Sequence, residues 1–321
     1  MVIKSKSLLK NKALNKWNLF WLISGPISIF MIINLLAVDT STGAGISEMI
    51  QFSVRWAVPF VYLVIATSSV QILFPGPFSR WLMRNRKYIG LCFAVAMAWQ
   101  ALFIFIMSYF FHEYYYSDVY YFRDEIEGSI GYIFLPAMVL TSFNFGSKLL
   151  TPKQWKLLHT SGIYFLWAYP FSVYWWNLYY YDNPVLIDYV FYWVGFVAFA
   201  LRIVAWGKQR YELSKRIDPN YKTPIESKML GGLFIIFGLL VSASGLYWQD
   251  LITSLFTASA WSAELELWLP FWPFEPFLSL LVIGIGTLLI TRGQTTESPV
   301  LAKGSYLEQR KDIRAAFLLS G

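Results

Sequence analysis

The sequence predicts an all-α polytopic membrane protein with about eight transmembrane helices and both termini in the cytoplasm. Of the 321 residues, 57% are apolar, 20% are aromatic and only 14% are charged, and the mean hydropathy is +0.48. These values are far from those of soluble domains. A helix that crosses the hydrocarbon core needs about 20 largely apolar residues. Such stretches occur at residues 17–37, 49–73, 88–111, 129–147, 158–180, 185–206, 229–248 and 275–291.

The basic residues predict the orientation of these helices. Positive residues accumulate in the cytoplasmic segments of membrane proteins, and 23 of the 26 lysines and arginines lie in the two terminal segments or in alternate loops. We therefore expect cytoplasmic tails at 1–16 and 292–321 and a cytoplasmic loop at 207–228. The net charge of +7 follows from this asymmetry and gives no support to nucleic-acid binding.

Several individual features bear on packing. The single cysteine, Cys92, lies inside the third apolar stretch, which excludes an intrachain disulfide and indicates a packing role. Gly231, Gly238 and Gly245 recur every seven residues, with Ser242 four residues after Gly238, and predict a small-residue face on the seventh helix. That face is expected to pack within the bundle, and docking of another subunit stays open. The interrupted segment 249–276 is expected to lie along the outer interface.

Two arginines fall inside apolar stretches. Burying an arginine in a membrane costs several kcal/mol unless the side chain is paired or reaches the interface. Arg55, in the outer half of its stretch, is therefore expected to have a partner, for which Glu48, Glu113 and a lipid phosphate are the candidates. Arg202 lies near the inner end of its stretch, so we expect it to reach the interface without a special role.

Two segments carry a resemblance to a known family. "NRKYIGLCFAVAMAWQALF" (85–103) and "QWKLLHTSGIYFLWAYPFSVYW" (154–175) resemble the third and fifth helices of the ferric-reductase-like transmembrane domain. The likeness is greatest to the haem-binding membrane subunit of the bacterial periplasmic methionine sulfoxide reductase system. "QFSVRWA" (51–57) is similar to the start of that family's second helix. The resemblance implies a bacterial inner-membrane protein with a six-helix core at 17–206 and two additional helices within 229–291.

The resemblance also implies a cofactor position. That family holds b-type haem between histidines of the third and fifth helices, because low-spin iron needs two strong axial ligands. The corresponding positions here are Gln100 and Ser172, neither of which is a usual haem ligand, and the helix rise of about 1.5 Å per residue places them level with each other. Met97 and Tyr169, each one turn away, are chemically competent replacement ligands. Arg55 could face a haem propionate in haem-bearing relatives.

The two histidines of the chain do not restore this site. His112 and His159 lie at opposite ends of their helices, about 30 Å apart, so they cannot share one iron. His112 is expected to be solvated. His159 is interpreted as an interfacial histidine bonded to a loop or a lipid headgroup, or as a contact for quinone or a second cofactor.

Three functions follow as hypotheses. The favoured one is a haem-less relative of an electron-transfer subunit that acts as a membrane partner or binds a small molecule. The alternative is a working haem b or quinone-linked oxidoreductase component with altered ligands, which passes electrons to a separate membrane or periplasmic partner. A transporter ranks last, because such proteins carry several ionisable or broken-helix features at mid-membrane. The lipid bilayer is a partner in all three.

Overall fold

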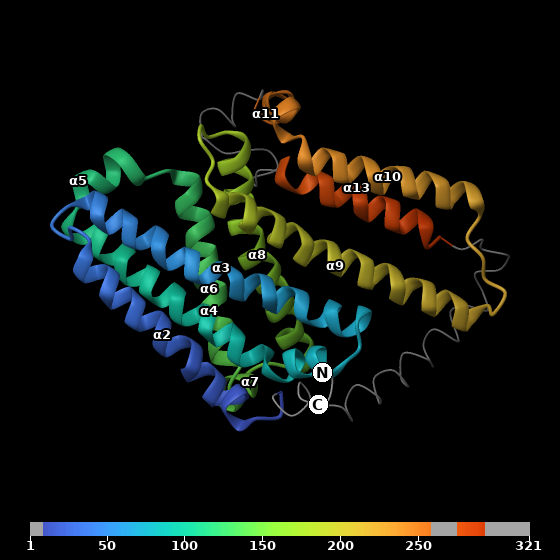
Figure 1. The fold of residues 1–321 in the computed structure, drawn as a ribbon, viewed down its shortest axis with the longest axis horizontal. Helices are drawn as coiled ribbons and strands as arrows, with labels where there is room; N and C mark the ends of the chain where they lie inside the picture. The colour runs from blue at the N-terminus through green and yellow to red at the C-terminus, as the bar shows by residue number, and fades with distance from the viewer. Residues whose placement is uncertain (1–8, 258–274, 293–321) are drawn as a thin grey trace.

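The computed structural model describes residues 9–257 and 275–292, and these residues form helices and turns without any strand. Five of the long helices are long and apolar enough to cross a membrane, which indicates a multi-pass membrane protein. Figure 1 shows the bundle. Its long helices are α2 (Lys16–Ala37), α3 (Gly43–Leu73), α4 (Pro77–Phe110), α6 (Phe122–Thr141), α8 (Pro152–Tyr179), α9 (Leu186–Ile217), α10 (Ile225–Ala243) and the shorter α13 (Glu275–Ile290).

Consecutive long helices run in opposite directions. Helices α3 and α9 run the same way, because Gly195 packs on the ring of Tyr62 near one end and Lys208 donates a hydrogen bond to the carbonyl of Ile72 near the other. Contacts between α2 and α4 show that this pair is also parallel. The alternation brings the loops after α3, α6 and α9 to one end of the bundle. This alternation is compatible with eight membrane crossings. The number of crossings and the side of the membrane on which each loop lies stay predictions.

The observed helix ends differ from several predicted ones. The apolar stretch 129–147 does not form one helix, because α6 ends at Thr141 and the chain turns before the short α7 (Asn144–Ser147). At Gly146 the backbone approaches so closely that a Cβ would lie 2.2 Å from the carbonyl oxygen of Leu140. Only glycine fits this position, and its close approach lets α7 fold back against the end of α6.

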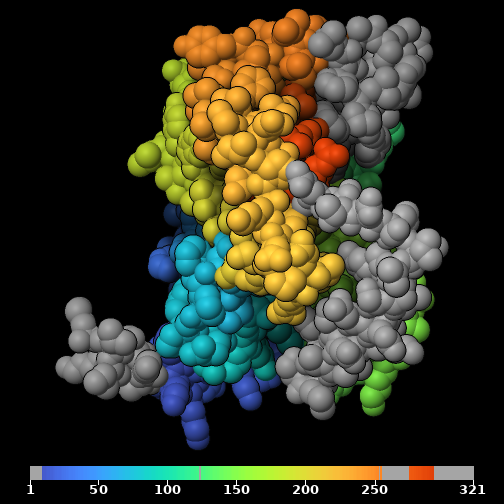
Figure 2. All heavy atoms as spheres, turned by 90° about the vertical axis from the view of Figure 1, so that its right-hand side faces the viewer, coloured from blue at the N-terminus to red at the C-terminus, as the bar shows by residue number. Residues whose placement is uncertain are grey.

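Helices α10 and α13 form an antiparallel pair beside α9. A Cβ on Gly231 would lie 2.6 Å from the carbonyl oxygen of Gly286, and one on Gly238 would lie 2.9 Å from that of Ser279. Gly231 and Gly238 of the predicted small-residue face therefore pack within the chain, against α13. Gly245 does not belong to this face, because α10 ends at Ala243 and Gly245 packs on the ring of Tyr179. Figure 2 shows α10 and the end of α9 on the face turned toward the viewer, next to the end of α3.

The N-terminal segment is packed rather than free over residues 9–15. The indole N–H of Trp81 donates to the carbonyl of Leu14 at 2.8 Å, and the Arg84 Nε donates to Asn15 Oδ1 at 3.0 Å. These bonds fix the segment to the N-terminal end of α4, whereas the sequence predicted only a cytoplasmic tail at 1–16. Residues 1–8 and 293–321, and most of the predicted interfacial segment, lie outside the described residues.

Candidate functional site

The side chains at the two positions that the resemblance assigns to haem ligands each form a hydrogen bond with a neighbouring protein group. On α4, Gln100 Oε1 accepts a hydrogen bond from the Tyr132 hydroxyl of α6 at 2.9 Å. On α8, the buried Ser172 hydroxyl donates to the carbonyl of Tyr169 one turn earlier, at 2.8 Å. Helices α3 and α6 each pack against both α4 and α8. No described hydrogen bond connects Gln100 with Ser172.

Large aromatic side chains surround these positions. Phe103 is fully buried and its ring centroid lies 5.9 Å from that of Trp99. Phe171 is also fully buried, stacked between Trp167 at 4.8 Å and Tyr192 at 5.4 Å. An amide and a hydroxyl that are already hydrogen-bonded, among packed rings, do not fit axial ligation of haem iron.

The two candidate replacement ligands lie in the same packed region. Met97 is partly buried against the main core, and its carbonyl oxygen accepts a bond from the Tyr132 hydroxyl at 3.3 Å. Tyr169 is half-buried, and its carbonyl holds Ser172. Ligation by either side chain stays a prediction.

The histidines lie where the sequence places them. His159 Nε2 lies 3.0 Å from the Thr141 hydroxyl, and its ring stacks on Trp155 at 4.1 Å. Its partner is thus the end of α6. His112 is exposed and its ring contacts that of Tyr116 at 4.6 Å. Neither arrangement brings the two rings toward a common site.

Arg55 does not form the predicted protein ion pair. Its side chain is exposed on α3, and neither Glu48 nor Glu113 lies within 4.0 Å of its guanidinium. An exposed side chain can reach the interface, so a lipid phosphate stays the candidate partner.

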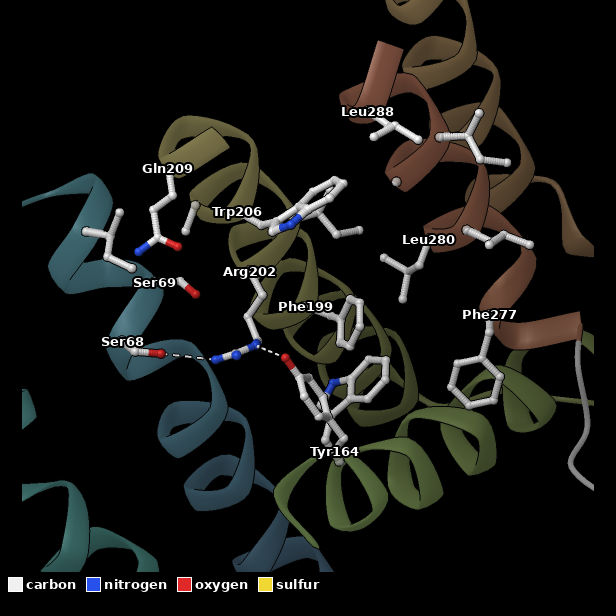
Figure 3. A pocket seen from close by; sticks show the side chains of 17 residues that line it. Ser68, Ser69, Tyr164, Phe199, Arg202, Trp206, Gln209, Phe277, Leu280 and Leu288 are labelled. Carbon is white, nitrogen blue, oxygen red and sulfur yellow. Dashed lines mark hydrogen bonds between the residues drawn. The ribbon is translucent and has the colours of Figure 1, made fainter. Parts of the chain in front are cut away.

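A hollow site lies instead between α3, α8, α9 and α13. It is a pocket of about 660 Å³, and Figure 3 shows the side chains that surround it. Helix α9 forms one wall, and the α13 wall opposite is apolar, with Phe277, Leu280, Leu281, Ile285 and Leu288. The polar groups gather on the other side, at Ser68, Ser69, Arg202 and Gln209. The pocket is therefore amphipathic, and a volume of this size suits a small molecule.

Arg202 is the charged group of this pocket. Its Nε donates to the Tyr164 hydroxyl at 2.8 Å, and its Nη1 donates to the Ser68 hydroxyl at 3.0 Å and to the carbonyl of Ile65 at 3.2 Å. These bonds use neither N–H of Nη2. Among residues 9–257 and 275–292, no carboxylate lies within 4.0 Å of the guanidinium. The planar guanidinium of Arg202 is thus held in one orientation, and no described carboxylate balances its charge.

A second cation lies near this group. Arg86 of α4 is half-buried and close enough to Arg202 for the two charges to repel each other. His159 and Tyr164 also lie within electrostatic reach of Arg86. Like charges in a medium of low dielectric constant attract an anion more strongly than either charge alone. Arg86 therefore adds a second positive charge beside the pocket.

The sequence did not indicate this pocket, because the Arg202 side chain was expected to reach the membrane interface without a special role. The structure turns the side chain toward α3 and α8, where Ser68 of α3 and Tyr164 of α8 hold it. The available signal was the polar cluster Thr67, Ser68, Ser69 and Gln71 in the last two turns of α3. Pairing α3 with α9 could not be deduced from one sequence.

Comparisons with known proteins identify no relative: no family model, no curated protein and no solved structure matches the chain.

Proposed function

We propose that this chain is a membrane protein that binds a small amphipathic molecule without using haem. The acidic head of the ligand lies on Arg202, and its apolar body lies against α13. The observation that carries the proposal is the guanidinium of Arg202, which lines a pocket and has no described carboxylate within 4.0 Å. A charge inside a membrane protein needs a compensating group, and ligand or substrate sites are where such charges are found unpaired.

The geometry supports an acidic head. The free edge of a guanidinium offers two N–H donors in one plane, which matches the two oxygens of a carboxylate or phosphate. Arg202 is kept in one orientation by Tyr164 and Ser68, so a ligand would not have to order it. The nearby charge of Arg86 adds to the preference for an anion.

The opposite wall supports a long apolar body. Leu281, Ile285 and Leu288 line the pocket and are exposed. On a membrane helix such exposed side chains contact acyl chains, so an amphiphile could enter sideways from the bilayer with its tail already solvated by lipid.

This function matches the small-molecule-binding form of the haem-less hypothesis and places the chain in the plasma membrane of a bacterium, with both termini in the cytoplasm. Its support is the pocket chemistry together with the resemblance of residues 85–103 and 154–175.

A quinone is the second candidate ligand. The rings of Trp167 and Phe199 stack with centroids 4.3 Å apart at one end of the pocket, and the Tyr164 hydroxyl lies next to them. A planar headgroup could extend this stack while its carbonyl oxygen accepts a bond from Arg202. The membrane electron-transfer alternative would use this site without iron.

Photo-crosslinking tests the two ligands. Full-length protein in nanodiscs of zwitterionic lipid is labelled with a diazirine-bearing fatty acid, and the cross-linked peptides are identified by mass spectrometry. We expect cross-links on α9 and α13 that oleate suppresses and methyl oleate does not. Suppression by a short-chain quinone but not by oleate would favour the quinone, and suppression by neither would contradict both proposals.

A matched pair of variants makes the test specific. Arg202→Gln removes the charge from the pocket, whereas Arg55→Gln removes the same charge from a position on α3 that does not line the pocket. Because a hydrogen bond to a charged group contributes about 1.5–3 kcal/mol, we expect roughly a tenfold or greater loss of oleate competition in Arg202→Gln only. An equal loss in both variants would mean that overall charge, and not this pocket, governs labelling.

A further inference from the structure

A second cavity lies at the inner end of the bundle, where the N-terminal segment meets α4. It has a volume of about 420 Å³ and lies between residues 10–18 and Arg84. Four of its seven lining residues are cations, namely Lys10, Lys12, Lys16 and Arg84, and no acidic residue lines it. We infer that this cavity binds the anionic phosphate headgroup of a membrane lipid. The inference is independent of the proposed function of the Arg202 pocket.

The cavity is built by fixed contacts. Arg84 donates from Nε to Asn15 Oδ1 at 3.0 Å and from Nη2 to the carbonyl of Leu9 at 3.1 Å, and Asn15 Nδ2 donates to the same carbonyl at 3.0 Å. The backbone N–H of Lys16 donates to the side chain of the fully buried Asn85 at 2.8 Å. These bonds hold the segment in place without using the amines of the three lysines.

The lysine amines have no partner of their own. Within the described parts of the chain, no hydrogen bond or ion pair involves the side-chain nitrogen of Lys10, Lys12 or Lys16. Lys16 has φ = 57°, a left-handed conformation that costs a residue with a Cβ about 1–2 kcal/mol. Strain of this kind is retained where the position of a side chain matters. Three exposed lysines that line one cavity, with no counter-charge among the described residues, form a site for an anion.

The surroundings favour a lipid as the source of the anion. Trp17 lines the cavity and packs against Tyr88 and Phe143, with centroids 5.4 and 6.2 Å away. Aromatic side chains beside lysines are typical of the membrane–water interface. From this point α2 continues into the apolar bundle with Trp21 and Leu22 exposed. A phosphate in the cavity would therefore have a surface for its acyl chains directly beside it.

The test titrates the purified full-length protein, kept in uncharged detergent, with short-chain phosphatidylglycerol and with phosphatidylcholine, and native mass spectrometry counts bound lipid. We expect one phosphatidylglycerol to be retained in preference to phosphatidylcholine. The variant Lys10→Gln/Lys12→Gln/Lys16→Gln keeps Arg84 and its scaffold bonds. Its affinity for phosphatidylglycerol should fall about tenfold or more, since each interfacial lysine contributes to attraction of anionic lipid.

The control variant is Lys148→Gln/Lys153→Gln/Lys156→Gln, which removes the same charge from exposed positions at the same end of the bundle. It should change the affinity less than twofold, within the usual effect of distant surface charge. Equal losses in both triple variants, or a loss in neither, would overturn the site. Displacement of the lipid by an equal concentration of glycerol phosphate would overturn a lipid source. If the triple variant does not fold, Lys10→Gln and Lys12→Gln alone should each show part of the loss, and an unchanged affinity in both would overturn the site.

Discussion

Helix α8 takes part in two regions that treat polar groups in opposite ways. Around Ser172 and Gln100, the serine hydroxyl and the amide oxygen each bond to a protein partner, close to fully buried rings. Five to eight residues before Ser172, the ring of Trp167 and Tyr164 border a pocket where the guanidinium of Arg202 has hydrogen-bond acceptors but no described counter-charge. In a bundle surrounded by lipid, a polar group with a protein partner needs nothing more. The guanidinium of Arg202 faces a pocket and has no described counter-charge, and this difference is the basis of the ligand site proposed above.

The largest effect expected from this comparison is all-or-none. Protein produced with added haem should show no Soret band and no b-type spectrum after dithionite reduction, because the packed region offers an amide and a hydroxyl in place of two imidazoles. The measurement is an oxidised and reduced absorption spectrum of the purified protein. A stoichiometric haem signal would remove the contrast between the two regions, and its loss in Met97→Ala or Tyr169→Phe would identify the ligands.

Packing should differ strongly between the regions. Phe171→Ala removes a fully buried ring and leaves a cavity, so we expect a loss of about 3 kcal/mol in the free energy of unfolding. Phe199→Ala removes a half-buried ring that already borders the pocket, and we expect about 1 kcal/mol because fewer contacts are lost. Reversible unfolding in mixed micelles measures both. Equal losses would mean that the pocket wall is as tightly packed as the centre.

The positions of the helices could be predicted from the sequence, whereas the Arg202 pocket could not, for a physical reason. Apolar runs and charge asymmetry are properties of single segments, so the positions of α2 and α13 were predicted within one residue of their observed ends. The turn at Gly146 was missed, because it depends on the close approach of a carbonyl and not on hydropathy. The pocket depends on which helices are neighbours. Arg202 looks like an ordinary interfacial arginine until α3 and α8 supply Ser68 and Tyr164.

A smaller effect is expected from the serine that helps to hold Arg202. Ser68→Ala removes one acceptor from the guanidinium, and a typical hydrogen bond contributes about 1 kcal/mol, so oleate competition should weaken roughly fivefold. Ser53→Ala on the same helix is the control, because its hydroxyl bonds only to the carbonyl of Ile50. Weakening by Ser53→Ala to the same degree would show that α3 acts through its general stability.

The smallest effect is expected from the most direct comparison, in which the same Tyr→Phe substitution is made once in the packed region and once at the pocket. Tyr132→Phe removes the hydroxyl that bonds to Gln100, and Tyr164→Phe removes the hydroxyl that accepts from Arg202. Hydrogen bonds between membrane helices contribute about 0.6 kcal/mol on average, so both variants should lose a similar small amount of stability. Only Tyr164→Phe should also alter oleate competition, because only there does the hydroxyl orient a charge that faces the pocket. Unfolding and cross-linking measured on the same samples separate the two consequences. If Tyr132→Phe changed ligand competition as much as Tyr164→Phe, the packed region and the pocket would be one coupled site, and the distinction between a satisfied and an unsatisfied polar region would lose its meaning for this protein.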